Sequence, residues 1–370
     1  MDDLMMKIWW KVAPERFRPP PVGVTPHSVI ATFGRSELLS YQPTVGTAYE
    51  TPVLFVPSLV NRHYILDLIP ERSVVKYLLD KGFGVYMLDW GIPGPEDSHT
   101  TMDDYLARRL HHAVRAVSAR HQGRPVTLVG YCMGGTMALA YAGFAPEKVK
   151  NLVLLATPVD FSQCGLLTLW SQGKRMPLES LVEAHRLIPP ALLQTAFTML
   201  QPGWVIKQAQ GALALPASLP KPKKGATPEE ISKLEAIKAQ AAAFQRGYLA
   251  LSRWVNDNVA VPGPAFQDWT RECFQRNALL GRQLAVAGKT IRPESISASI
   301  LNVIAAKDHI IPPPSSLALD GWMGTGRDVT SAVVDVGHIG LSVGQGSFSK
   351  VWAGVAAWLG PRSMKTNVEA

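Results

Sequence analysis

Apolar positions along the chain gather into short, uniformly apolar runs that alternate with stretches of helical periodicity. Buried strands are predicted at residues 53–56, 83–88, 126–129, 151–156, 299–305 and 330–335. Helices are predicted between or after them, near residues 65–80, 101–120, 134–144 and 346–359. Because apolar strands that alternate with helices form βαβ units, the pattern predicts an α/β protein with a mostly parallel sheet and helices on both faces.

The alternation is interrupted late in the chain. Before the interruption, residues 27–33 and 37–41 are predicted to form a hairpin around Gly34. After it begins, the sequence is mainly helical or irregular, and it includes a mixed-charge helix near residues 228–245. A long helical insertion of this kind indicates a cap over the carboxyl edge of the sheet. The predicted organisation is a lead segment at 1–26, a core at 27–160 and 285–362, and a cap insertion at 161–284.

Composition is that of a globular protein. Apolar residues make up 47% of the 370 positions and charged residues 18%, which supplies ample material for a core. The net charge of +8 is compatible with an anionic ligand and equally with solubility alone. No nucleic-acid-binding motif accompanies this charge, so we predict no nucleic-acid partner.

The three cysteines, Cys132, Cys164 and Cys273, include no C-x-x-C pair. Their number and spacing argue against a disulfide framework and against a zinc site, so no metal is predicted. Usable thiols favour a reducing compartment, and we expect the protein to be cytoplasmic.

The first residues are unusually apolar and include Trp9 and Trp10. Lys7 and Lys11 interrupt this stretch, so it is not expected to be a secretion signal. Packing onto the protein's own core and docking to a hydrophobic surface are both compatible with it. The chain contains no run of about 18 apolar residues, and no membrane-spanning segment is predicted.

The strongest local motif is Gly130-Tyr131-Cys132-Met133-Gly134-Gly135. A Gly-x-nucleophile-x-Gly turn between a strand and a helix is the nucleophile elbow of the α/β-hydrolase fold. Both flanks are present here, so Cys132 is the candidate nucleophile. The alternative is a small buried cysteine in a glycine-rich turn.

A cysteine at this position has a chemical consequence. A thiolate is more nucleophilic than an alcohol, and its acyl product is a thioester that can still pass the acyl group to a hydroxyl. The helix that follows Cys132 favours the thiolate form. The backbone N–H of Met133 is the first candidate oxyanion donor, and the N–H of Val60, after the early strand, is the second.

The order nucleophile, acid, histidine that this fold requires is met by Cys132, Asp308 and His338. Asp308 and His338 each follow a predicted strand, at the same edge of the sheet as Cys132. Asp160 also follows a strand and is the rival acid. His309 is a candidate for lining the pocket, or a solvated neighbour of Asp308.

These residues resemble the polyhydroxyalkanoate synthases, and most of all the catalytic subunit of class III. The resemblance extends over about residues 53–359. Besides the elbow, it rests on residues 60–68, 89–91, 101–105, 146–153, 157–161, 308–313 and 337–340. The chain departs from the class III pattern at Met133, where glutamine is usual, in altered cap residues 254–257 and 266–271, and in its own stretch 221–245.

The resemblance implies that the chain polymerises 3-hydroxyacyl-CoA into polyhydroxyalkanoate with release of CoA. Cys132 would hold the acyl group, His338 would be the base, Asp308 would support it, and Val60 would match the second oxyanion donor. Asn61 and His309 are further pocket candidates. Coenzyme A enters as part of the substrate, and no cofactor is expected.

The resemblance also implies partners: the growing polyester chain, the surface of a cytoplasmic polyester granule, and either a non-catalytic synthase subunit or a second copy in a homodimer. Two other functions are compatible with the residues. One is an esterase or thioesterase with the same cysteine triad, and the other is a non-catalytic, granule-associated homologue.

Overall fold

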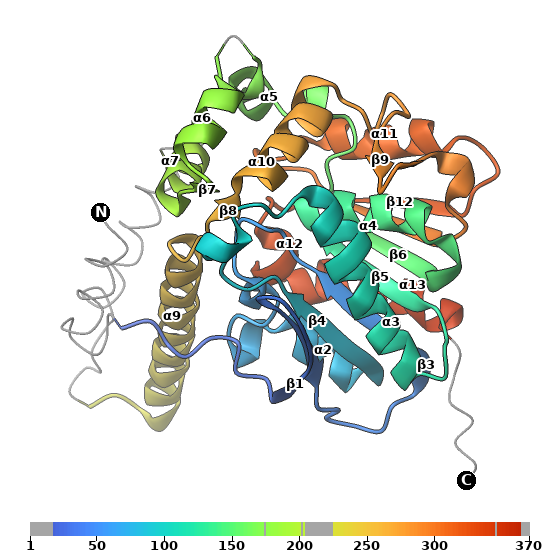
Figure 1. The fold of residues 1–370 in the computed structure, drawn as a ribbon. Helices are drawn as coiled ribbons and strands as arrows, with labels where there is room; N and C mark the ends of the chain where they lie inside the picture. Colours follow the sequence, from blue (N-terminus) through green and yellow to red (C-terminus); the bar gives the residue numbers. More distant parts are fainter. Residues whose placement is uncertain (1–17, 174, 201–202, 204–224, 345, 364–370) are drawn as a thin grey trace.

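The computed structural model describes residues 18–173, 175–200, 203, 225–344 and 346–363, so the predictions on Trp9 and Trp10 and on residues 221–224 fall outside it. An eight-stranded sheet with the order β1-β2-β4-β3-β5-β6-β11-β12 forms the centre (Figure 1). Its strands are β1 (His27–Phe33), β2 (Ser36–Tyr41), β3 (Tyr49–Val56), β4 (Phe83–Asp89), β5 (Val126–Tyr131), β6 (Val149–Leu155), β11 (Ser299–Ala305) and β12 (Val329–Val334).

The sheet is mostly parallel, as the apolar runs predict. The six strands from β4 to β12 in the sheet order pair in parallel, whereas β2 is antiparallel to both β1 and β4. The predicted hairpin around Gly34 is therefore confirmed. Because the six strands run the same way, their carboxyl ends meet at one edge, where this class of sheet places its ligands.

Alternate residues of each strand serve two different cores. In β3, Leu54 and Val56 belong to one cluster, and Val53 and Phe55 belong to the other. Helices α3 (His111–Arg120), α4 (Met133–Phe144) and α11 (Pro313–Met323) complete the first cluster, whereas α2 (Val74–Asp80) and α13 (Ala353–Arg362) complete the second. Strands that are apolar on both faces thus bury their side chains on both sides of the sheet. Each large apolar side chain that is fully buried stabilises the fold by about 1.5–3 kcal/mol.

The helix predicted at residues 65–80 is confirmed only for its second half, where α2 (Val74–Asp80) forms. The chain forms two short 3-10 turns, His63–Leu66 and Pro70–Arg72, and only then α2. Pro70 has no N–H with which to continue a helix. Ser73 then starts α2 by accepting a hydrogen bond from the Lys76 N–H at 2.9 Å.

Between β6 and β11 the chain forms inserted helices, most of which lie beyond one end of the sheet, whereas the longest extends down one side (Figure 1). They are α5 (Leu166–Ser171), α6 (Leu178–Ala184), α7 (Pro190–Leu200), α9 (Pro228–Val255) and α10 (Gly263–Trp269). Short strands β7 (Leu187–Ile188) and β8 (Val261–Pro262) pair within this region, and β9 (Ala285–Val286) pairs with β10 (Lys289–Thr290) after it.

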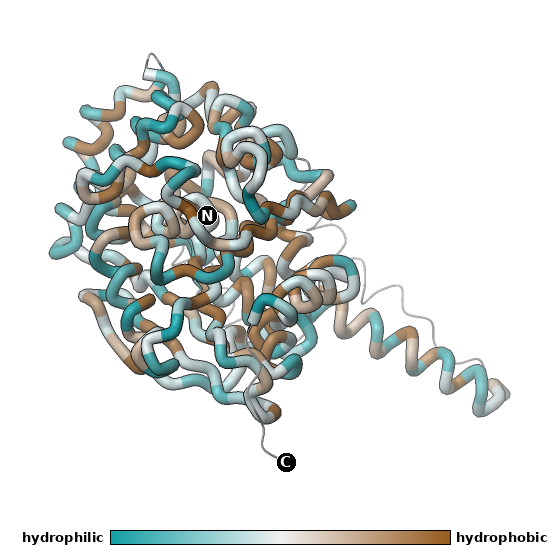
Figure 2. The backbone as a smooth tube through the Cα atoms, turned by 90° about the vertical axis from the view of Figure 1, so that its right-hand side faces the viewer, coloured by the Kyte–Doolittle hydropathy of each residue, from teal (hydrophilic) through white to brown (hydrophobic). Residues whose placement is uncertain are grey.

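Helix α9 is longer than its predicted span of 228–245. A capping box of Thr227 and Glu230 starts it, and it continues to Val255, where its last turns pack on the core. Figure 2 shows that the other end stands away from the rest of the molecule. Within the residues that the structure describes, no helix has both the length and the apolar character needed to cross a bilayer.

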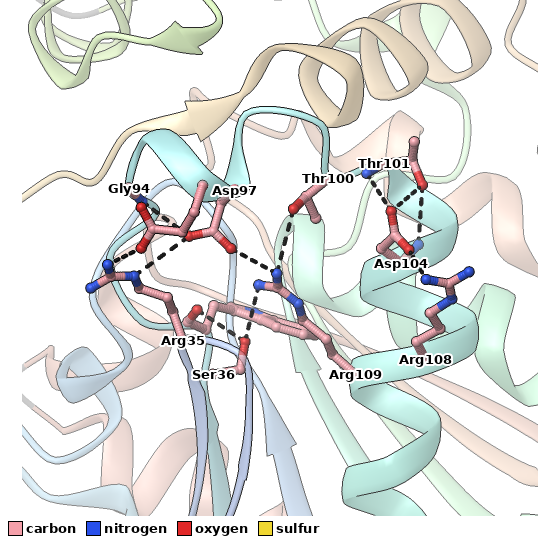
Figure 3. Close-up of polar contacts among 11 residues, drawn as sticks. Arg35, Ser36, Gly94, Asp97, Thr100, Thr101, Asp104, Arg108 and Arg109 are labelled. Carbon is pink, nitrogen blue, oxygen red and sulfur yellow. Dashed lines mark hydrogen bonds and ion pairs between the residues drawn. The ribbon is translucent and has the colours of Figure 1, made fainter.

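A polar network fixes the loop between β4 and α3 (Figure 3). Residues Asp104–Leu110 wind as a π-helix into α3, which confirms a helix over most of 101–120. From this turn, Arg109 reaches Asp97 at 2.9 Å, and both side chains are almost completely buried. The Thr100 carbonyl beside them accepts the N–H of Ala265 in α10 at 3.1 Å. The ion pair thus helps to seat the inserted helices.

We expect Arg109→Met to lower the free energy of unfolding by about 3 kcal/mol, because Asp97 would lose its closest cation in a buried position. The matched control is Arg108→Met, which removes a 3.1 Å pair with Asp104 from a side chain that is 77% exposed. That variant should change stability by less than about 0.5 kcal/mol. Urea unfolding followed by circular dichroism measures both, and equal losses would contradict the prediction.

Candidate active site

Cys132 occupies a strained position between β5 and α4. Its backbone lies at φ 55° and ψ −124°, a conformation that residues other than glycine rarely adopt. The Cys132 N–H donates to the Leu155 carbonyl at 2.9 Å, and its own carbonyl accepts from Gly135 at 2.8 Å. The turn is therefore held by the neighbouring strand on one side and by the first turn of α4 on the other, as a nucleophile elbow requires.

Gly134 and Gly135 lie so close to the neighbouring strand ends that neither position has room for a side chain. A Cβ on Gly134 would lie 2.1 Å from the Val56 carbonyl oxygen at the end of β3. A Cβ on Gly135 would lie 1.8 Å from Oγ1 of Thr157, beyond the end of β6. Helix α4 can begin this close to the strand ends only because both positions lack a side chain.

The structure brings together the predicted acid and base. His338 Nδ1 and Asp308 Oδ2 are 2.6 Å apart, and the two residues are 5% and 7% exposed. The other oxygen of Asp308 accepts the N–H groups of Ile310 and Ile311, both at 2.8 Å. Asp308 is thus fixed as a hydrogen-bond acceptor, and it holds the proton of His338 on Nδ1.

The surroundings of His338 favour its charged form. Burial alone would lower the pKa of His338, but the Asp308 carboxylate in contact with its Nδ1 contributes to raising that pKa well above its ordinary value. Such a histidine can accept a proton from a nearby thiol and stabilise the thiolate that forms.

The rival residues have other surroundings. Asp160 accepts hydrogen bonds from Ser162 and Asn277 and caps a short 3-10 turn. Cys164 and Cys273 lie in one apolar cluster, each 2% exposed. Burial raises the pKa of Cys164 to about 12 and that of Cys273 well above its ordinary value. Neither thiol is therefore suited to nucleophilic chemistry.

The candidate oxyanion donors lie on either side of the cysteine. Met133 is the first residue of α4, so its N–H has no acceptor within the helix. The Val60 N–H has only a long contact of 3.4 Å with the Ser58 hydroxyl, and Val60 lines the same pocket as Cys132 and His338.

The loop that carries Val60 is fixed from both sides. The Val60 carbonyl accepts the N–H of Val259 at 3.2 Å, and the Arg62 carbonyl accepts the indole N–H of Trp254 at 2.7 Å. On the opposite side, Asp89 pairs with Arg62 at 3.3 Å. Burial opposes ionisation of Asp89, but His63 and Arg62 outweigh it and lower its pKa to about 2. The loop is thus tied to the inserted helices and to the sheet.

A single pocket surrounds these groups. Cys132, His338, Asn61 and His309 all line it, so both pocket candidates from the sequence lie there. The Asn61 amide also donates to Asn258, beyond α9. Sequence reasoning missed the lining from the inserted helices, for which no motif was available: Gln194, Phe197, Thr198, Trp254, Val255 and Asn258. No cluster of side chains suited to a metal ion occurs in the described part of the chain.

The sheet, the elbow and the Asp308–His338 pair define an α/β-hydrolase-fold protein with cysteine at the nucleophile position. Residues 51–202 match the family model for the alpha/beta hydrolase fold. A solved structure described as a putative lipase from Sulfolobus solfataricus is similar, with a TM-score of 0.53 and 15% identity, and the match covers 91% of this chain and 93% of the other.

Further comparisons identify the family. Residues 20–78 match the model for the N-terminus of poly-beta-hydroxybutyrate polymerase. Two proteins named poly(3-hydroxyalkanoate) polymerase subunit PhaC, from Thiocystis violacea and Synechocystis, are each 32% identical over 92% of this chain, and the matches span 90% and 86% of their lengths. One of the same name from Haloferax mediterranei is 32% identical, and the match spans 65% of its length. The chain belongs to the poly(3-hydroxyalkanoate) polymerase family.

We expect Gly134→Ala to lower the melting temperature and disrupt the elbow. The added Cβ would meet a backbone oxygen, which cannot rotate away, and such overpacking costs about 1–3 kcal/mol. The control is Gly354→Ala in α13, where nothing lies within 4 Å of the new Cβ. There, alanine should stabilise by about 0.5–1 kcal/mol. Thermal unfolding distinguishes the two, and a Gly134→Ala protein as stable as the parent would refute the close approach.

Proposed function

We propose that this chain polymerises 3-hydroxyacyl groups from CoA thioesters into a polyester, with Cys132 as the acyl carrier, His338 as the base and Asp308 as its support. The observation that carries the proposal is the buried 2.6 Å contact of His338 Nδ1 with Asp308, next to a cysteine held in an elbow. Membership of the polymerase family, shared over most of the chain, supplies the reaction.

In the first step, the Cys132 sulfur attacks the carbonyl carbon of the hydroxyacyl-CoA thioester. Because Asp308 occupies Nδ1, the Nε2 atom of His338 is the one that takes the thiol proton. The N–H groups of Met133 and Val60 would stabilise the negative charge on the carbonyl oxygen. The bond to the CoA sulfur then breaks, CoA leaves with the proton from His338, and an acyl thioester remains on Cys132.

In the second step, the 3-hydroxyl of another hydroxyacyl-CoA attacks the thioester carbonyl. His338 takes the hydroxyl proton, an ester bond forms, the bond to the Cys132 sulfur breaks, and the proton returns to that sulfur. The lengthened chain is still a CoA thioester, so it can acylate Cys132 again. A thioester serves this transfer better than an ester because it remains activated toward a hydroxyl.

Transfer to a hydroxyl also requires that water be kept from the thioester. We propose that the inserted helices, within residues 161–284, act as a cap for this purpose. Phe197 from α7 and Trp254 and Val255 from α9 give the pocket apolar walls next to Cys132. Such a covered site favours acyl transfer over the hydrolysis expected of an esterase or thioesterase.

The same proposal extends to partners and location. The Thiocystis and Synechocystis relatives are named as polymerase subunits, which supports a class III arrangement with a non-catalytic subunit. A homodimer is the alternative. We further propose that the chain needs no cofactor, and that it works in the cytoplasm at the surface of the polyester granule that it makes.

The reaction is tested with purified protein and 3-hydroxybutyryl-CoA, by measuring CoA release with a thiol reagent and analysing the acyl product by mass spectrometry. We expect CoA release together with oligomers of hydroxybutyrate. If only free 3-hydroxybutyrate appears, the protein is a hydrolase. If no CoA is released from hydroxyacyl-CoA substrates, with or without a co-expressed partner subunit, the polymerase proposal fails.

Cys132→Ala should abolish both CoA release and covalent acylation, a loss of at least about 10³-fold for a nucleophile. Cys164→Ala and Cys273→Ala are the matched controls, because they remove thiols that burial keeps protonated. They should retain most of the activity. Intact-protein mass spectrometry after substrate addition locates the acyl group. Acylation that persists without Cys132, or disappears without Cys164, would show that the wrong thiol was chosen.

A further inference from the structure

Tyr131 directly precedes the nucleophile and stacks on the base, and the proposed mechanism gives it no role. It is the last residue of β5, directly before Cys132, and its side chain is buried at 4% exposure. Its hydroxyl donates to the backbone carbonyl of His338 at 2.9 Å. Its ring is stacked on the imidazole of His338, with centroids 5.2 Å apart and an angle of 25° between the planes.

We propose that Tyr131 is the positioning residue for the imidazole of His338, an inference that rests on the proposed role of His338 as base for Cys132. Asp308 holds His338 through one nitrogen, and a single hydrogen bond leaves the ring free to tilt about it. The face of Tyr131 removes this freedom, while its hydroxyl fixes the backbone of the loop from which His338 extends.

The position of Tyr131 in the chain makes this arrangement effective. Tyr131 and Cys132 are neighbours at the rigid end of β5, so the residue that orients the base moves with the nucleophile. When a catalytic base lies about 1 Å away from its productive position, the rate of the catalysed reaction falls strongly. The aromatic ring also stabilises a positive charge on the imidazole, through the interaction of a cation with a π system.

The hydroxyl remains a donor throughout the working pH range. Burial raises the pKa of Tyr131 to about 12, so the group stays protonated and keeps its bond to the His338 carbonyl. The simpler interpretation is that Tyr131 only fills the core, where a buried tyrosine commonly finds a hydrogen-bond partner. The two interpretations differ in what the reactivity of Cys132 should do when the ring is removed.

The test compares Tyr131→Phe, which keeps the ring, with Tyr131→Leu, which removes it. The rate of Cys132 alkylation by iodoacetamide is measured from pH 5 to 10 by mass spectrometry of the Cys132 peptide. For Tyr131→Leu we expect the midpoint of the alkylation rate against pH to move upward by about one pH unit. Without the aromatic ring the charged imidazole is less stable, so it stabilises the thiolate less. Tyr131→Phe should keep the parent midpoint and lower kcat about fivefold, with KM unchanged.

The matched control is Tyr141→Leu. It removes a buried tyrosine whose hydroxyl lies 3.1 Å from His111 Nδ1, and neither residue lines the pocket. It should lower the melting temperature and leave the alkylation profile unchanged. If Tyr131→Leu does not fold, Tyr131→Met takes its place, because methionine fills a similar volume without an aromatic face. A parent-like profile for the ring-less variant would overturn the proposal.

Alkylation requires no acyl substrate, so it separates this proposal from the proposed function. A shifted profile in a protein that never releases CoA would support the positioning role and reject the polymerase. An unshifted profile in an active polymerase would do the reverse.

Discussion

The close approach of α4 to the ends of β3 and β6 is the constraint on which the rest of the site depends. Gly134 faces the Val56 carbonyl and Gly135 faces Thr157, at separations that leave no room for a Cβ. Cys132 has a positive φ in the turn between β5 and α4. The close approach places the amino end of a buried helix next to the thiol, where the helix dipole favours negative charge. The strain at Cys132 persists because strand and helix hold the turn from both sides.

The acid and base reach this point through the same sheet edge. β11 and β12 pair in parallel, so the loops after them, which carry Asp308 and His338, open beside the elbow. The Asp308 carboxylate accepts two backbone N–H groups through one oxygen and contacts His338 Nδ1 through the other, so its orientation toward the imidazole is fixed. Such interactions are stronger where water is excluded, and residues of α7 and α9 line the pocket beside them.

The sequence could predict the parts of this site that follow from local rules. The apolar runs predict the six parallel strands, and the elbow motif together with chain order selects Cys132, Asp308 and His338. The helix expected at residues 65–80 begins only at Val74, because Pro70 and the Ser73 cap outweigh a favourable apolar pattern. The pocket walls could not be predicted, since contacts such as that of Asn61 with Asn258 join residues 197 positions apart and follow no periodicity.

The loop after β3 joins the pocket to the inserted region. Val60 lines the pocket, and its carbonyl accepts the N–H of Val259, so this one residue contacts both the pocket and the inserted region. Trp254, which binds the Arg62 carbonyl two residues on, is itself a pocket wall. A shift of the inserted region would therefore move both a wall of the pocket and the residue that we propose as the second oxyanion donor. Under the proposed function, the outcome of transfer against hydrolysis therefore depends on the contacts of this loop as well as on the proposed triad.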